Sequence, residues 1–177
     1  MRIVAGLYGG RKLIAPAGSE TRPTSDRVRE ALFSVLGPSI RDTRVLDLFA
    51  GSGALGLEAL SRGAAQAVFV DRSRKAIAAI RANLDALGID AEVRPIEARA
   101  ALRAASARHE AYDLVFLDPP YRRAAELGRE LSEGLTAVLA PGARVITESD
   151  RRALLELDLP LADERRYGDT VIRIHES

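Results

Sequence analysis

The sequence predicts an α/β fold: a mostly parallel, doubly wound sheet with an antiparallel C-terminal strand, plus a small N-terminal β-hairpin and helix. Two observations predict it. From residue 44 onward, short apolar runs alternate with segments of helical periodicity, which is typical of βαβ units. The last two strand-like runs instead flank Gly168-Asp169, a hairpin signal. With 177 residues, 47% of them hydrophobic, the chain is long enough to bury a core of its own.

The N-terminal region is predicted as a separate unit. Two short runs within residues 2–15 flank Tyr8-Gly9-Gly10, and paired glycines supply the positive φ angles of a tight turn. Residues 24–26 offer helix N-caps, and apolar residues then recur at helical spacing until Gly37-Pro38 ends the helix. We therefore divide the chain into an extension, residues 1–40, and a sheet domain, residues 41–177.

The sheet domain alternates strands and helices in the manner of a Rossmann-like sheet. The expected strands are 45–49, 67–71, 92–96, 113–118 and 143–148, followed by a hairpin of 163–167 and 170–175. The expected helices are 54–62, 73–87, 98–105 and 124–139, with a short helix at 152–157. A turn at Pro141-Gly142 is expected to precede the fifth strand.

The composition excludes several kinds of site. Cysteine is absent, which excludes disulfides, Cys-ligated metals and thiol catalysis. The two histidines, His109 and His175, lie far apart in the sequence, so we expect neither a metal site nor a Ser–His–Asp triad. No apolar run reaches about 18 residues, and the N-terminus lacks the apolar stretch of a signal peptide. We expect a cytoplasmic monomer without membrane contact.

Basic residues are concentrated near the N-terminus. Residues 1–44 carry eight Lys or Arg and four Asp or Glu, whereas the rest of the chain carries 18 basic and 21 acidic residues. This distribution favours a polyanionic partner for the first segment. A solvated charged face is the alternative.

A glycine turn follows the first strand of the sheet domain, in the run Asp47-Leu48-Phe49-Ala50-Gly51-Ser52-Gly53-Ala54-Leu55-Gly56. In doubly wound sheets, ligands bind at the carboxyl ends of the strands, and glycines let a ligand approach the backbone. Asp71 ends the next strand and can accept hydrogen bonds from two ribose hydroxyls of a cofactor. The three glycines also match the dinucleotide fingerprint G-x-G-x-x-G, so both cofactor classes fit the glycines.

Asp47 separates these two cofactor classes. A carboxylate beside the glycine turn would repel a pyrophosphate, whereas it attracts the ammonium and sulfonium groups of S-adenosylmethionine. The structural alternative for Asp47 is to cap the turn, and for Asp71 it is to cap the following helix. We therefore favour S-adenosylmethionine over NAD.

The motif Asp118-Pro119-Pro120-Tyr121 follows the fourth strand. It resembles the D/N-P-P-Y/F motif of amino-methyltransferases, which methylate exocyclic amines of bases and glutamine amides. Hydrogen bonds from an amine to the Asp118 carboxylate and the Pro119 carbonyl free the nitrogen lone pair. The prolines stiffen the loop, and Tyr121 offers a ring on which an extruded base can stack. The resemblance thus makes Asp118, Pro119, Pro120 and Tyr121 catalytic, with a rigid turn as the structural alternative.

Three further stretches narrow the resemblance: Thr21 to Phe33 (T-R-P-T-S-D-R-V-R-E-A-L-F), Gly53 to Ala64, and Tyr167 to Thr170. Together they resemble, over nearly the whole chain, the bacterial methyltransferases that modify N2 of a guanine in 16S rRNA. The resemblance implies a class I methyltransferase sheet and S-adenosylmethionine as cofactor. It implies an enzyme of the 16S rRNA (guanine(966)-N(2))-methyltransferase type, with rRNA of the small subunit or of an assembly intermediate as partner.

The resemblance also implies roles for single residues. Thr21 to Thr24 would close over the methionine end of the cofactor, and Glu97 and Ala98 would border its adenine. The implied cofactor-binding residues are Asp47, Phe49, Ala50, Gly51, Ser52, Gly53, Asp71, Arg72, Glu97, Ala98, Thr21, Arg22, Pro23 and Thr24. The implied RNA-binding residues are Arg22, Arg27, Arg29, Arg122 and Arg123. For the first three arginines, ion pairs on the helix surface, such as Asp26 with Arg29, are the alternative.

Four other functions are weighed against this one. A DNA adenine-N6 methyltransferase shares the chemistry, but it usually carries a target-recognition domain for which 177 residues leave no space. A protein glutamine methyltransferase would have a different N-terminal domain. An NAD-dependent oxidoreductase fits the glycines but neither Asp47 nor Asp118 to Tyr121. A catalytically silent RNA-binding module would not need the residues that are predicted to bind the cofactor and the amine.

Overall fold

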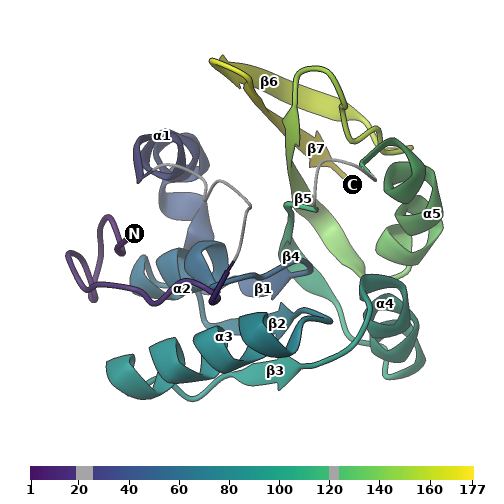
Figure 1. The fold of residues 1–177 in the computed structure, drawn as a ribbon. Helices are drawn as coiled ribbons and strands as arrows, with labels where there is room; N and C mark the ends of the chain where they lie inside the picture. Colours follow the sequence, from purple (N-terminus) through teal and green to yellow (C-terminus); the bar gives the residue numbers. More distant parts are fainter. Residues whose placement is uncertain (19–25, 120–123) are drawn as a thin grey trace.

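A seven-stranded sheet lies between two layers of helices in the computed structural model, which describes residues 1–18, 26–119 and 124–177 (Figure 1). The strand order is β3-β2-β1-β4-β5-β7-β6. The strands are β1 (Arg44–Asp47), β2 (Gln66–Val70), β3 (Glu92–Arg94), β4 (Tyr112–Leu117), β5 (Leu139–Asp150), β6 (Leu161–Tyr167) and β7 (Thr170–Glu176). Strands β1 to β5 are parallel, and β7 runs antiparallel to both of its neighbours. The predicted fold class is confirmed.

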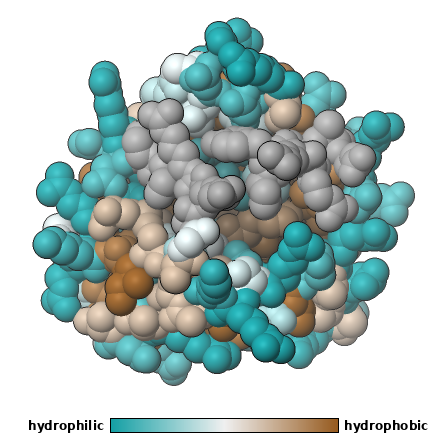
Figure 2. All heavy atoms as spheres, viewed as in Figure 1, coloured by the Kyte–Doolittle hydropathy of each residue, from teal (hydrophilic) through white to brown (hydrophobic). Residues whose placement is uncertain are grey.

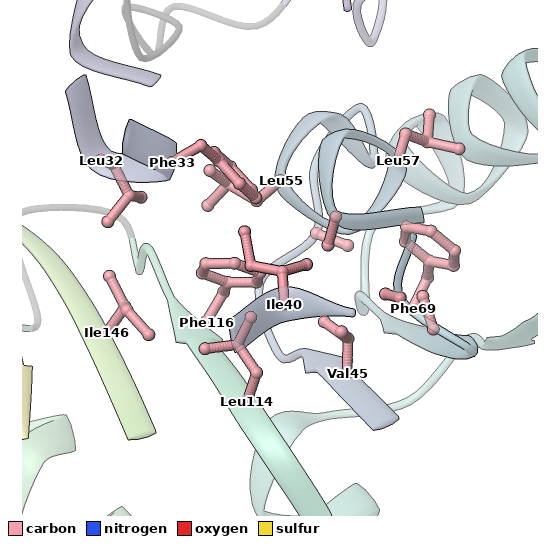
Figure 3. Packing of buried hydrophobic residues seen from close by; sticks show 14 of the residues in the cluster. Leu32, Phe33, Ile40, Val45, Leu55, Leu57, Phe69, Leu114, Phe116 and Ile146 are labelled. Carbon is pink, nitrogen blue, oxygen red and sulfur yellow. The ribbon is translucent and has the colours of Figure 1, made fainter. Parts of the chain in front are cut away.

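Each face of the sheet carries its own apolar core. The helices are α1 (Asp26–Leu36), α2 (Ala54–Ser61), α3 (Arg74–Leu87), α4 (Ala98–Ala107) and α5 (Ala124–Thr136). Apolar residues of α1, α2 and α3 pack on one face with Phe69, Phe116 and Ile146, whereas α4 and α5 pack on the other. Figure 3 shows the first core, in which the rings of Phe33 and Phe116 lie 5.7 Å apart. This is the layer arrangement that βαβ units require.

The helices begin and end where local signals place them. The Ser73 hydroxyl accepts a hydrogen bond from Ala76 N–H at the start of α3, and Gly88 ends that helix with a φ of 67°. A 3₁₀ turn, Gly37–Ile40, follows α1 where Pro38 prevents the helix from continuing. Residues 24 and 25, expected to cap α1, lie outside the described residues.

The N-terminal extension is not a regular hairpin. Its strands are reduced to one bridge between Arg2 and Lys12, because much of its backbone hydrogen-bonds to α2 instead. The fully buried Glu58 carboxylate accepts from Val4 N–H at 2.7 Å and from Ala5 N–H at 3.1 Å. The Ser61 hydroxyl accepts from Tyr8 N–H and donates to the Ala5 carbonyl, and the Ser61 carbonyl accepts from Leu7 N–H. The extension thus shares the core of the sheet, to which Ile3 also contributes.

One prediction in the C-terminal half is wrong. No helix forms at 152–157, because Leu155 is fully buried and the chain here lies against α5. There Gly128 approaches the carbonyl oxygen of Glu156 so closely that a Cβ would lie 1.9 Å from it. The Pro141-Gly142 turn lies inside β5, which begins at Leu139: Gly142 has a φ of 73°, and regular pairing with β4 starts after it, at Arg144.

The surface shown in Figure 2 is mainly hydrophilic, with smaller apolar areas. Leu7, Ile14 and Leu161 are the large apolar side chains most exposed among the described residues. Within the described ranges, no helix combines the length and the hydropathy needed to cross a membrane.

Candidate functional site

Four acidic residues lie at one edge of the sheet. Strands β2, β1, β4 and β5 are parallel neighbours, so their carboxyl ends meet at the same edge. Asp47 ends β1, Asp71 follows β2, and Asp118 follows β4. Glu148 directly follows Thr147, the last residue of β5 that pairs with β4. This edge is where doubly wound sheets bind ligands, and it is the candidate site.

Asp47 is a buried carboxylate at the N-terminus of α2. Its side chain is 1% exposed, and its Oδ2 accepts a hydrogen bond from Gly56 N–H at 3.1 Å. Its Oδ1 is buried and has no partner among the described residues. Burial raises the pKa of Asp47 to about 7, the Gly56 hydrogen bond lowers it and the charge of Asp71 raises it. A cationic ligand would supply the missing partner and stabilise the charged form.

The glycine pattern has a packing explanation. Gly56 faces the ring of Phe69 on β2, where a Cβ would lie 2.4 Å from a ring carbon. Gly53 has a φ of 81°, a conformation that glycine adopts without strain. The α2 N–H that a pyrophosphate would use is also taken by Asp47. The match to the dinucleotide fingerprint therefore comes from helix–strand packing and does not favour NAD.

Asp71 ties the glycine turn to the next strand. Its Oδ2 accepts from Gly51 N–H at 3.0 Å, and its Oδ1 accepts from Ser73 N–H at 2.8 Å. A carboxylate has about four acceptor positions, so these two bonds leave room for two hydroxyl donors. Asp71 is thus held in place by the backbone and still has the capacity to bind a ribose.

The glycine turn also contacts the N-terminal extension. The side chain of Asn83 on α3 donates to the Ser52 carbonyl at 2.9 Å, and it exchanges hydrogen bonds with both backbone groups of Ile14. Ala50 N–H donates to the Val70 carbonyl at the end of β2. Asn83 thus fixes the turn and the extension together. Its position in the middle of an amphipathic helix gave no signal of this role.

An ion pair joins the ends of β2 and β3. Arg72 Nη1 lies 3.0 Å from Glu97 Oε1, and both side chains are mostly exposed. Ala98 is buried and begins α4, where backbone N–H groups lack helical partners. Phe49 is partly buried beside the turn. These residues therefore border the place where the resemblance puts an adenine.

The motif predicted to be catalytic, Asp118 to Tyr121, is described only in part. Asp118 is partly exposed and Pro119 is buried at the end of β4. The register pairs Asp47 with Phe116, so the motif begins two residues beyond the level of Asp47. Several predicted site residues lie outside the described residues: Thr21, Arg22, Pro23, Thr24, Pro120, Tyr121, Arg122 and Arg123.

The predicted RNA-binding arginines of α1 differ from each other. Arg27 is exposed, as a phosphate contact requires. Arg29 is 0% exposed, and its Nη2 donates to the Arg2 carbonyl and to Asp26 Oδ1. The structure thus contradicts the expectation for Arg29, because its guanidinium lies inside the protein and holds the backbone at Arg2 against α1.

Glu148 was passed over by the sequence reasoning. It is 4% exposed on β5, beside the strand that carries the catalytic motif. The signal that could have found it is the one used for Asp47, Asp71 and Asp118, namely an acid at the end of a parallel strand. No cluster of three or more possible metal ligands occurs in residues 1–18, 26–119 and 124–177.

Comparisons with known proteins agree with this geometry. A family model described as conserved hypothetical protein 95 matches residues 1–176. YlbH of Bacillus subtilis is 40% identical over 186 aligned residues, which cover 99% of this chain and 98% of YlbH. The ribosomal RNA small subunit methyltransferase D of Escherichia coli is 46% identical over 124 residues, 70% of this chain and 61% of that protein.

A solved structure extends the similarity to three dimensions. The hypothetical protein TTHA0928 of Thermus thermophilus superposes with a TM-score of 0.87 at 33% identity, covering 100% of this chain and 99% of that one. The strand-end acids and the glycine turn therefore lie on a scaffold shared along the whole chain. The chain belongs to the conserved hypothetical protein 95 family, the family of the small-subunit rRNA methyltransferase D proteins, and is a methyltransferase of Rossmann-like fold.

Proposed function

We propose that this chain transfers a methyl group from S-adenosyl-L-methionine to the N2 amine of a guanine in 16S rRNA, at the position numbered 966. The observation that carries the proposal is the pairing of β1 with β4. It puts the buried Asp47, which suits a cationic cofactor, beside Asp118, which suits an amine. The family supports rRNA as the substrate class, since the E. coli relative is an rRNA methyltransferase.

Asp47 and Asp71 would hold the cofactor. Asp47 Oδ1 would face its positive charge, and Asp71 would accept from its ribose hydroxyls. Ala98 and the Arg72–Glu97 pair would border the adenine. When bound, S-adenosylmethionine supplies a methyl group on a cationic sulfur, which makes the methyl electrophilic.

Asp118 and Pro119 would orient the amine. The Asp118 carboxylate and the Pro119 carbonyl each accept one N–H of N2, which turns the nitrogen lone pair towards the methyl group. The new C–N bond forms as the C–S bond breaks, and sulfur keeps the bonding electrons and becomes neutral. Asp118 then accepts the proton that N2 releases. The positive charge crosses between two carboxylates, so the electrostatics of the site favour the transfer.

The N-terminal extension, residues 1–40, would cover the cofactor and face the RNA. Its described part packs against α2 and Asn83, next to the glycine turn. Exposed Arg27 supplies a phosphate contact there. Thr21 to Thr24, Pro120, Tyr121, Arg122 and Arg123 belong to this proposal on the resemblance alone. The enzyme would act in the cytoplasm as a monomer, on the small subunit or an assembly intermediate.

The test is methylation of rRNA by the purified chain. Small subunits from a strain lacking this gene are incubated with the enzyme and methyl-labelled S-adenosylmethionine, and the nucleosides are separated by mass spectrometry. The proposal expects N2-methylguanosine at one position, formed about 100-fold or more slowly with Asp118→Ala, which removes the side-chain acceptor of the amine. Label in adenosine, in protein or in no product would contradict it.

A further inference from the structure

Glu148 is a buried acidic residue next to the strand that carries Asp118. It is 4% exposed, and Ile146 and Ile172, both buried, are its neighbours. Ile146 precedes it by two residues on the same face of β5, and Ile172 lies directly opposite on β7.

The sheet register puts Glu148 beside Asp118. Leu117 pairs with Thr147, so the residues that follow are Asp118, directly after the end of β4, and Glu148 on β5. Phe116 and Ile146, two residues earlier, both point into the core under α1 (Figure 3). Because side chains alternate along a strand, Asp118 and Glu148 follow them on that same face. The two carboxylates therefore continue an apolar floor at the carboxyl edge of the sheet.

We infer that Glu148 determines specificity for guanine by accepting the N1–H of the target base. The inference rests on the proposed function. Guanine carries two adjacent hydrogen-bond donors on its Watson–Crick edge, the N2 amine and N1–H. Asp118 takes the amine and Glu148 takes N1–H. A base with an unprotonated N1 presents a lone pair there, which a carboxylate repels.

The spacing of the strands suits this arrangement. Neighbouring strands lie about 4.8 Å apart, and a hydrogen bond to a carboxylate spans about 2.8 Å. Two carboxylates on neighbouring chain segments can therefore accept N1–H and the N2 hydrogen that points away from N1, because these two N–H bonds diverge. The other N2 hydrogen, which is parallel to N1–H, is left to the Pro119 carbonyl. The side chains of Phe116 and Ile146 below them are apolar, so they offer the base no hydrogen bond of their own.

The test compares guanine with 2-aminopurine at the target position. The analogue retains the N2 amine, but its N1 is an acceptor. RNA containing either base is ligated from synthetic fragments, and kcat/KM for N2 methylation is measured with wild type and Glu148→Gln. We expect wild type to prefer guanine by about 100-fold or more, because a buried hydrogen-bonding site rejects an analogue that cannot pair. In Glu148→Gln the ratio falls at least about tenfold, because the amide can donate to the analogue's N1.

The intrinsic reactivity of each base is the same with both enzymes, so a change in the ratio reports on the protein. Thr147→Val is the matched control. Thr147 is the adjacent residue on the opposite face of β5, and its buried hydroxyl has no partner among the described residues. Its replacement keeps the shape and should leave the ratio unchanged. Calorimetry with S-adenosylmethionine checks that each variant is folded.

Three outcomes would overturn the inference. One is a wild-type preference below about tenfold, which needs no variant. Another is an equal loss on both bases in Glu148→Gln, which indicates a structural role. The third applies if Glu148→Gln fails to fold. In that case the inference is overturned if Glu148→Asp, which keeps the charge, loses the preference for guanine. In all three cases wild type still methylates guanine, whereas failure of the proposed function would leave no N2 methylation at all.

Discussion

The two halves of the sheet edge hold their carboxylates differently. On the cofactor half, Asp47 and Asp71 accept hydrogen bonds from backbone N–H groups of the glycine turn and of the residues around it. On the base half, Asp118 and Glu148 are carried to neighbouring positions by the pairing of β4 with β5. The first pair is thus built by local turn geometry, and the second by strand register. Asp118 still belongs to a local motif, but no local pattern connects it with Glu148, because the contact between their strands depends on register.

The comparison predicts different kinetic effects for the two halves, and Asp118 gives the largest. Asp118→Ala should lower turnover about 100-fold or more while S-adenosylmethionine affinity stays within a few-fold, because the lost contact acts on the reacting amine. Single-turnover rates and calorimetry measure the two quantities. If Asp118→Ala instead lost cofactor affinity but kept its turnover at saturating cofactor, Asp118 would bind the cofactor and not the amine.

Asp71→Ala should have the opposite effect. It removes contacts present in both the ground state and the transition state, and it frees Gly51 N–H in the turn. We expect cofactor affinity to fall about 10- to 100-fold, with turnover at saturating cofactor changed little. Initial rates over a range of cofactor concentrations provide the measurement. A turnover defect like that of Asp118→Ala would show that the halves are not separable.

Asp47 predicts a pH dependence on the cofactor half. Burial raises its pKa to about 7, so below that pH the free protein holds it protonated. Because an aspartate in the unfolded chain has a pKa of 3.8, the raised pKa favours the folded state most below about pH 4, and this contribution is lost as pH rises from there to about 7. A cationic cofactor favours the carboxylate, so its affinity should rise up to about tenfold between pH 6 and about 7.5. Calorimetry on wild type and Asp47→Asn tests this, since the variant should lose the dependence; an equal slope in both would contradict it.

The smallest effect concerns the two arginines of α1. Arg27→Gln should flatten the log–log dependence of RNA affinity on salt by about 0.7–0.9, because one phosphate contact is lost. Arg29→Gln should leave that slope unchanged and lower the midpoint of thermal unfolding, since Arg29 is buried on Asp26 and Arg2. RNA binding over a salt series separates the two. If the slope in Arg27→Gln equals that of wild type, Arg27 does not contact RNA and the RNA-binding surface lies elsewhere.

Much of the fold could be predicted because its signals are local. Strands β1, β2 and β4 are apolar runs, α3 has its Ser73 cap and Gly88 stop, and Gly168 makes the last hairpin. The prediction of a helix at 152–157 was wrong because its apolar residue Leu155 is buried against α5 by a segment that is not helical. The contact depends on Gly128, whose missing side chain no local pattern connects with that segment.

The candidate site divides in the same way. Asp47, Asp71 and the glycines could be found because a motif of a few residues defines them. Arg29 could not be separated from Arg27, since both are basic residues on one helix and only packing buries the first. Glu148 required the β4–β5 register, which depends on residues about 30 positions apart.

The Glu58 contacts also constrain the order of folding. Val4 and Ala5 find their acceptors 54 and 53 residues later in the chain, and Ile14 pairs with Asn83, 69 residues later. Residues 4–14 therefore have no docking surface until α2 and α3, which follow them in the chain, have formed and packed. Closing such long loops is slow compared with forming a helix. We therefore expect this segment to dock after the helices that it contacts, although it precedes them in the chain.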